Sequence, residues 1–276
     1  MRAALVIAQM TLAEARRRRI LAAALALGAA FVTLFAVGLH FIARDVRAHA
    51  NPTQQGFAFA YVVLAALYAA NFLIVMTSVL VTIDTLSGEI GSGVIETLCT
   101  KPVPRWSVAL GKWLGCWTIL ALYAAVLCGG VLAVSRLEAG YTPPQPARGL
   151  ALLLLEGTVL LTLALAGGTR LSTLANGLTV FGLYGLAFIG GWMEQIGTVT
   201  GNAAARYLGI GASLLVPSES LWQLAAYLMQ PPLVRDAGMG PLSPHSVPSP
   251  AMVVWALGYV AATLALALAS FRRRDL

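Results

Sequence analysis

Six long apolar runs dominate the sequence and decide what the chain can fold into. A bilayer core about 30 Å thick is crossed by about 20 apolar residues in an α-helix. Charged residues make up only 11% of the 276 residues, whereas a soluble domain carries about 25% and needs them to cover its surface. The sequence therefore predicts an all-α polytopic membrane protein, with one transmembrane domain over residues 1–276. The predicted spans are 20–42, 59–83, 113–134, 149–168, 177–194 and 251–271.

The basic residues predict which way the spans point. An even number of spans places both termini on one side of the membrane. Of the 18 Lys and Arg residues, 12 lie in the segments 1–19, 84–112, 169–176 and 272–276, which alternate with the other connecting segments. Because Lys and Arg accumulate on the cytoplasmic side, both termini are predicted to be cytoplasmic, in a membrane of the bacterial inner type. The basic residues lie at the ends of apolar runs and form no surface with interleaved aromatic residues, so a nucleic-acid partner is not expected.

The N-terminal segment 3–19 is predicted to be a helix at the inner membrane surface. Its basic cluster can bind anionic lipid headgroups, although a role only in setting the topology explains it equally well. A cleaved signal peptide is the alternative, because 48–50 reads Ala-His-Ala. The apolar run is longer than the 7–15 residues of a signal peptide, which argues against cleavage. The cluster is Arg16, Arg17, Arg18 and Arg19.

The predicted outer segments differ in length. Segments 43–58 and 135–148 are expected to be short connectors, whereas 195–250 is long enough to suggest a function, such as binding a protein on the outer side. Within it, Ser218 is predicted to cap a helix from Glu219 to about Met229. That helix has one apolar face and is expected to lie at the outer interface or to pack on the spans.

Several catalytic signatures are missing from the sequence. Gly111-Lys112 is followed by Trp113 and is not part of a nucleotide-binding P-loop. The three histidines are scattered, and the three cysteines (Cys99, Cys116 and Cys128) lack the spacing of a metal or disulfide framework. We therefore expect no enzyme activity, no metal site and no bound cofactor in this chain.

Glu156 is the one acid well inside a predicted span. A carboxylate in a bilayer is costly and marks a candidate functional site. It either lines a transport path or packs against a neighbouring span, hydrogen-bonded to a group such as Tyr184 or Thr162. A single acid gives little support for ion-coupled transport, which usually involves several.

The inner loop between the second and third spans is the most informative part of the sequence. Three glycines, Gly88, Gly91 and Gly93, are expected to loosen the end of the second span. Residues 94–100 then predict a short amphipathic helix, which Pro102 ends. A short helix joined to two spans is suited to contacting a soluble partner and transmitting its motion.

This loop resembles the signature of type-2 ATP-binding-cassette (ABC) permeases. Within that family it is most similar to the branch of the permease that serves copper maturation of nitrous oxide reductase. The pattern is D-x3-G-E-x3-G-x4-L-x-T-x-P-x2-R-x4-L-G-K, and the layout of the whole chain agrees with it. The matching residues are Asp84, Gly88, Glu89, Gly93, Leu98, Thr100, Pro102, Arg105, Leu110, Gly111 and Lys112.

The resemblance implies an exporter made of two permeases and two separate cytoplasmic ATPase subunits, with a homodimer of permeases favoured. The ATPase would bind ATP and Mg²⁺, and the inner loop would act as a coupling helix docked on it. The residues that the resemblance assigns to this coupling are Asp84, Gly88, Glu89, Gly93, Val94, Glu96, Leu98, Pro102 and Arg105.

Two other functions stay open from the sequence. A secondary transporter would rest on Glu156 and would work without nucleotide. A membrane anchor that transports nothing would recruit a partner through 195–250.

Overall fold

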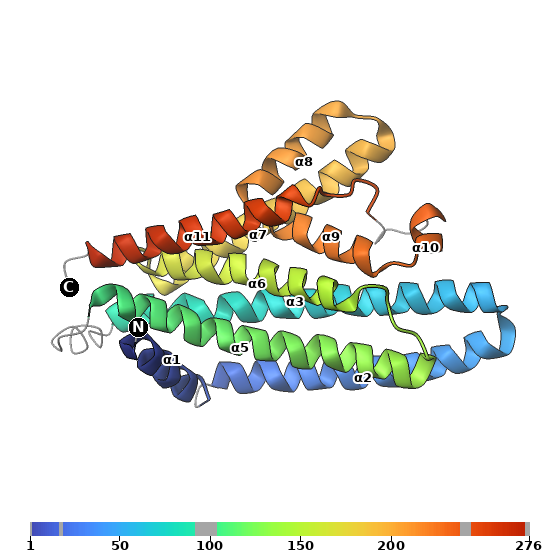
Figure 1. Ribbon diagram of the computed structural model, residues 1–276, viewed down its shortest axis with the longest axis horizontal. Helices are drawn as coiled ribbons and strands as arrows, with labels where there is room; N and C mark the ends of the chain where they lie inside the picture. Colours follow the sequence, from blue (N-terminus) through green and yellow to red (C-terminus); the bar gives the residue numbers. More distant parts are fainter. Residues whose placement is uncertain (1, 17–18, 92–103, 238–243, 274–276) are drawn as a thin grey trace.

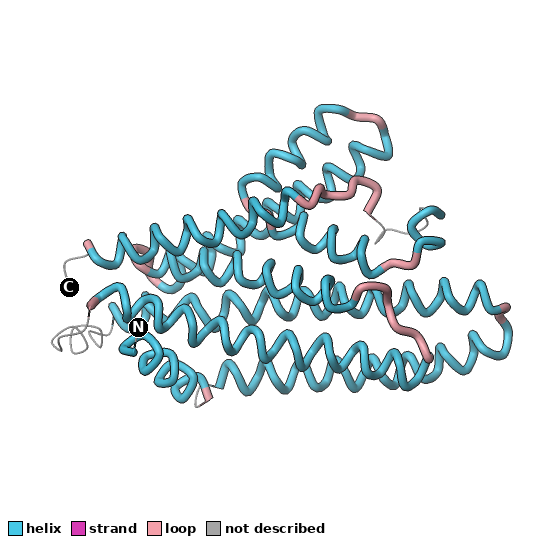
Figure 2. The backbone as a smooth tube through the Cα atoms, viewed as in Figure 1, coloured by secondary structure: helices cyan, strands magenta, loops and turns pink. Residues whose placement is uncertain are grey.

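The computed structural model describes residues 2–16, 19–91, 104–237 and 244–273. Within these ranges the chain consists of helices and loops without a strand (Figures 1 and 2). Six of the described helices are long and apolar enough to cross a membrane, which confirms the predicted all-α fold with six spans. They are α2 (Arg19–His49), α3 (Pro52–Gly91), α5 (Arg105–Val134), α6 (Pro146–Gly168), α7 (Thr173–Thr200) and α11 (Ala251–Arg272).

The spans are longer than their apolar runs. α3 has 40 residues, which is about 60 Å at the rise of an α-helix. The helix continues through Gly88 and includes Gly91. The prediction that glycines loosen this end of the span is therefore wrong for these two residues, and Gly93 lies outside the described residues. Most of the predicted connector 43–58 is helical as well, and a π-helical turn, Ser135–Ala139, extends α5. Helix formation needs no apolar residues, so a helix can continue beyond the apolar run that is long enough to cross a membrane.

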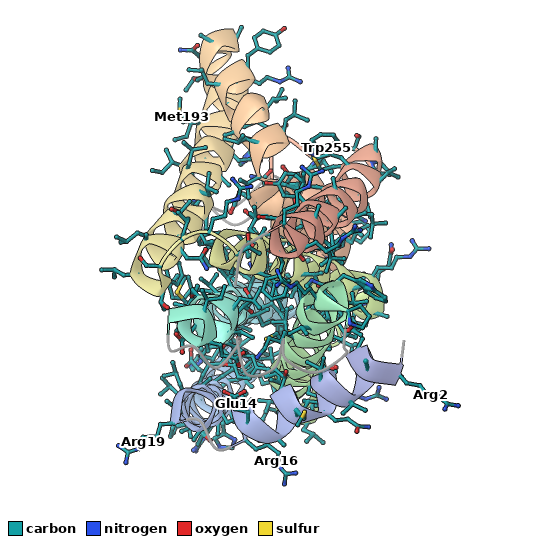
Figure 3. All side chains as sticks on the ribbon, turned by 90° about the vertical axis from the view of Figure 1, so that its left-hand side faces the viewer. Arg2, Glu14, Arg16, Arg19, Met193 and Trp255 are labelled. Atoms are coloured by element: carbon teal, nitrogen blue, oxygen red, sulfur yellow. The ribbon has the colours of Figure 1, made fainter. Side chains whose placement is uncertain are left out.

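Both chain termini lie at one end of the bundle, together with the end of α3 and the beginning of α5 (Figure 1). We call this the loop end. The connection between α2 and α3 lies at the opposite end (Figure 1). Figure 3 views the loop end, where the labelled side chains of Arg2, Arg16 and Arg19 point away from the protein. Arg17 and Arg18 lie outside the described residues. The side of the membrane to which this end belongs stays a prediction.

Helices α3, α5 and α6 form the centre of the bundle. In the most apolar stretch of α6, 67% of the residues are buried, against 6% in that of α2, so the described chain leaves most of the surface of α2 uncovered. Two tryptophans of α5 donate hydrogen bonds to threonines of α6. Trp113 Nε1 lies 2.9 Å from Thr162 Oγ1, and Trp117 Nε1 lies 3.1 Å from Thr158 Oγ1. Because these bonds satisfy polar groups inside the bundle, they fix the register of the two helices.

Helix α1 (Arg2–Ala15) packs across α5. Its buried residues are small and recur at helical spacing: Ala4, Ala8, Thr11 and Ala15. A Cβ atom added at Gly111 would lie 2.6 Å from Ala4 O, and one at Gly115 would lie 2.7 Å from Thr11 Cβ. The two glycines therefore allow the close contact. The N-terminal helix ends before the arginine cluster and packs on the protein, whereas its contact with the membrane surface stays a prediction.

The described part of the segment between α7 and α11 contains three helices, α8 (Ala203–Leu215), α9 (Ser218–Met229) and α10 (Pro232–Ala237). Only α9 was predicted. α7 and α8 form a hairpin that projects from the bundle (Figure 1). Its turn is made by Gly201, whose φ of 70° favours glycine. Asn202 then caps α8 by accepting a hydrogen bond of 3.2 Å from the backbone N–H of Ala205.

Helix α9 lies inside the bundle, where it packs on α6 and α7. Ten of its 12 residues are buried, so it packs on the spans and does not lie at the outer interface. The predicted cap is wrong, because the helix begins at Ser218 and Pro217 occupies the cap position without a side-chain bond. The Ser218 hydroxyl is buried and has no hydrogen-bond partner among the described residues.

Candidate functional sites at the loop end and inside the bundle

The first candidate site is the point where α3 and α5 leave the bundle. Lys112 Nζ donates to Glu89 Oε1, and the two side chains are 5% and 13% exposed. A buried ion pair holds its two elements together because loss of either charge leaves the other unpaired in a poor solvent. Glu89 and Lys112 therefore join the end of the second span to the beginning of the third.

A second set of contacts joins α3 to α7. Thr173, the first residue of α7, donates a hydrogen bond of 3.1 Å to Asp84 Oδ1, and its hydroxyl lies 3.0 Å from Ser87 Oγ. A Cβ atom at Gly88 would lie 2.1 Å from Asp84 Oδ1. Gly88 thus provides the space in which the Asp84 carboxylate reaches Thr173. The end of α3 is fixed to both neighbouring spans by residues of the sequence motif.

The second candidate site is a buried pair of glutamates. Glu156 on α6 is 0% exposed, and Glu219 on α9 is 5% exposed. Glu219 acts electrostatically on Glu156, and Asn71 of α3 interacts with the same carboxyl group. A Cβ atom at Gly191 of α7 would lie 2.2 Å from Glu219 Cγ, so this glycine makes the space that Glu219 occupies. Four helices therefore build the site.

The glutamate pair has polar neighbours but no cation among the described residues. The hydroxyl groups of Tyr68 and Tyr184 interact electrostatically with both carboxyl groups. The ring of Tyr68 also packs against that of Trp222, with 5.0 Å between the ring centres. No described Lys, Arg or His forms an ion pair with either glutamate. Thr162, one of the partners expected for Glu156, instead pairs with Trp113.

Several hydrogen-bond acceptors around the pair lack a donor. Neither oxygen of Glu156 lies within hydrogen-bond distance of a donor in the described part of the chain, although Asn71 is close to it. Asn71 Oδ1 and Gln223 Oε1 likewise have no donor among the described residues. Buried acceptors without donors are costly. Burial raises the pKa of Glu219 to about 8, although its hydrogen bond with Gln223 acts in the opposite direction. Glu219 thus carries its proton at neutral pH and can serve as a donor.

Comparison with known proteins identifies the family. The model of the ABC-2 family transporter proteins matches residues 5–276. The chain belongs to this family. It is an integral membrane protein and a membrane subunit of an ABC transporter, as the motif at 84–112 predicted.

Two relatives of this ABC-2 permease carry the same description, "Probable ABC transporter permease protein NosY". The one from Stutzerimonas stutzeri is 30% identical over 286 residues, which cover 97% of each chain. The one from Pseudomonas aeruginosa is 34% identical over 125 residues, which cover 43% of this chain and 46% of that protein. Both agree with the branch of the family that the loop motif resembles.

The structure of the ABC-2 permease describes only part of the predicted coupling site. Asp84, Gly88 and Glu89 lie on the last turns of α3, and Arg105 is the first residue of α5. The predicted coupling helix 94–100 lies outside the described residues, as do the other residues assigned to it. These are Gly93, Val94, Glu96, Leu98 and Pro102.

Sequence reasoning missed one member of the buried site. The sequence places Glu219 only at the beginning of a predicted helix, whereas in the fold it is buried and acts electrostatically on Glu156. One signal was available, because Ser218, Glu219, Ser220 and Gln223 are polar residues on a helix that is otherwise apolar. Such a group of polar residues suggests a buried hydrogen-bonding face.

Proposed function

We propose that the chain is the permease of an ATP-driven exporter, in which a separate cytoplasmic ATPase docks on the loop between α3 and α5. The observation that carries the proposal is the attachment of the last turns of α3 to α5 through Glu89–Lys112 and to α7 through Asp84–Thr173. A force applied to the loop is passed to three spans at once. An ABC permease has an ATPase partner, and this end of the bundle is shaped to receive its motion.

The loop end then faces the cytoplasm of a bacterial-type cell. This orientation is supported by the 12 of 18 Lys and Arg residues in the segments that the positive-inside rule assigns to it. ATP and Mg²⁺ would be bound by the ATPase. Closure of the ATPase dimer would push the coupling loops, and the permease would change its arrangement so that the substrate leaves on the outer side.

Two copies of the permease complete the transporter in this proposal. Gly190 and Gly191 of α7 are covered by α8 and α9 of the same chain, whereas a Cβ atom at Gly182 or Gly185 would meet nothing within 4 Å. We infer that this open face of α7 lies at the seam of a homodimer. Cysteines at Gly182 and Gly185 should cross-link between copies. Cysteines in the loop 140–145 serve as the control, and cross-linking there alone would exclude α7 from the seam.

A protein on the outer side would bind to residues 195–250.

The coupling contact is tested by Glu96→Arg with Leu98→Asp. Charge reversal and loss of an apolar contact at an interface commonly cost several kcal/mol of binding free energy. The variant should insert normally but lose co-purification of the ATPase and ATP-driven transport. Asp45→Arg is the control, because Asp45 is exposed on α2 near the opposite end. Normal ATPase binding and transport in the loop variant would exclude the docking site.

Ion-coupled transport is the second candidate function, and the Glu156–Glu219 pair is the observation that favours it. Two buried carboxyl groups without a cation can take up and release protons. Glu156→Gln separates the two functions, because the amide keeps the shape and hydrogen bonding of the side chain. ATP-driven transport by the reconstituted complex should stay within a few-fold of wild type. Uptake driven by an ion gradient without ATP, and lost in the variant, would identify the chain as a secondary transporter.

A further inference from the structure

A pocket of about 300 Å³ lies at the loop end, between the end of α6 and the end of α11. It belongs neither to the α3–α5 contact nor to the glutamate pair. Its lining combines two arginines and two hydroxyl groups with apolar residues. The lining residues are Ala166, Thr169, Arg170, Leu266, Ala267, Ala269, Ser270 and Arg273.

The polar side of the pocket is organised by hydrogen bonds. Arg170 Nε donates to Ser270 Oγ at 3.0 Å, and the same oxygen lies 3.1 Å from Thr169 Oγ1. The bond through Nε fixes the plane of the Arg170 guanidinium and leaves its Nη groups to donate elsewhere. Neither Arg170 nor Arg273 forms an ion pair with an acid in the described part of the chain. Two guanidinium groups at one pocket are suited to a phosphate group.

The apolar side of the pocket faces along the spans. Ala166 and Leu266 lie on spanning helices, whereas Arg170 is the second residue after the end of α6 and Arg273 is the first after the end of α11. Leu266 is 69% exposed, so it offers an open apolar surface below the arginines. A ligand that fills this pocket therefore has an anionic group at the level of the helix ends and a hydrocarbon chain along the helices.

We propose that this pocket is a binding site for one anionic phospholipid. The headgroup phosphate accepts hydrogen bonds from the guanidinium groups of Arg170 and Arg273, and one acyl chain lies along Ala166 and Leu266. Because the bound lipid touches α6 and α11 together, it stabilises their contact at the loop end. A free phosphate ion satisfies the arginines but leaves the apolar wall uncovered. The site therefore selects the lipid.

Native mass spectrometry of the purified chain tests the proposal. Phosphatidylglycerol and phosphatidylcholine with identical acyl chains are added together, and the ratio of their one-lipid adducts is measured. Arg170→Gln with Arg273→Gln should lower the preference for phosphatidylglycerol about tenfold, since each basic residue near a membrane surface contributes to attraction of anionic lipid. Arg44→Gln with Arg206→Gln is the matched control. It removes two exposed charges from α2 and α8, outside the pocket, and should keep the preference.

A second variant tests the shape of the pocket without changing its charge. Ala269→Phe places a ring in the pocket and should reduce the retained phosphatidylglycerol as strongly as the double arginine variant. An equal loss in the Arg44 and Arg206 control would show general surface attraction and overturn the proposal. An unchanged preference in Ala269→Phe would overturn it as well. Inorganic phosphate is added in a separate arm, and displacement of the lipid by phosphate would identify a site for a small anion instead.

Discussion

Two buried acidic sites in the bundle differ in whether a cation balances the carboxyl group. Glu89 at the loop end is paired with Lys112, so its charge is balanced where α3 meets α5. Glu156 in the interior has another glutamate beside it and no cation among the described residues. A balanced pair suits a permanent attachment between helices, because separating the charges is costly. An unbalanced pair suits a site whose protonation or contacts change.

The largest expected effect comes from removing the cation of the balanced site. Lys112→Met removes the cation that is paired with the buried Glu89, and loss of one member of a buried ion pair costs about 3–5 kcal/mol of unfolding free energy. Denaturant unfolding in detergent measures the loss. Glu89→Gln with Lys112→Met removes both charges and should recover most of the stability. If the double variant is as unstable as the single one, packing rather than charge holds α3 to α5.

The next effect concerns pH and the unbalanced site. The pKa of Glu219 rises on folding from 4.5 to about 8, so the folded chain holds one more proton between these values. Stability from this group is therefore fully present below pH 4.5 and is lost as pH rises through about 8. The total change is on the order of a few kcal/mol.

The variant Glu219→Gln tests that sign. It keeps the side-chain shape but removes the titration, so stability should fall less between pH 5 and 9 than in the wild type. The denaturation midpoint is measured across this range for both proteins. An identical pH profile in the two would show that Glu219 is already ionised in the folded chain at neutral pH.

The smallest expected effect compares two serines. Ser172 caps α7 by accepting from the backbone N–H of Ala175, whereas the buried Ser218 hydroxyl has no partner in the described residues. Ser172→Ala should cost about 1 kcal/mol, and Ser218→Ala should cost less or stabilise the chain. Thermal unfolding of both variants measures the two costs in stability. An equal cost for both would show that Ser218 makes a hydrogen bond after all.

The six spans could be predicted because each apolar run is long enough on its own. The ends of the helices could not, because Arg44 to His49 and 135–139 are polar enough to read as loops yet contain no residue that stops a helix. α8 was missed for the opposite reason. Its apolar residues follow closely on those of α7, and the Gly201-Asn202 turn between them is short.

The candidate sites could be predicted only where they are local in sequence. Asp84, Gly88, Glu89 and Lys112 belong to one motif, although their pairing with one another and with Thr173 came from the fold. Glu156 stood out as an acid in an apolar run. Glu219 could not be assigned to it, because the polar residues of α9 indicate a buried face but not the helix against which that face packs.

The packing of α1 on α5 has a consequence for how the protein is made. α1 is synthesised first, whereas the glycines that accept it, Gly111 and Gly115, emerge only after two spans have been completed. Until then the helix on which its small-residue face packs has not been made. Docking of α1 therefore requires α5, and it can complete the N-terminal half of the bundle only after the third span is present.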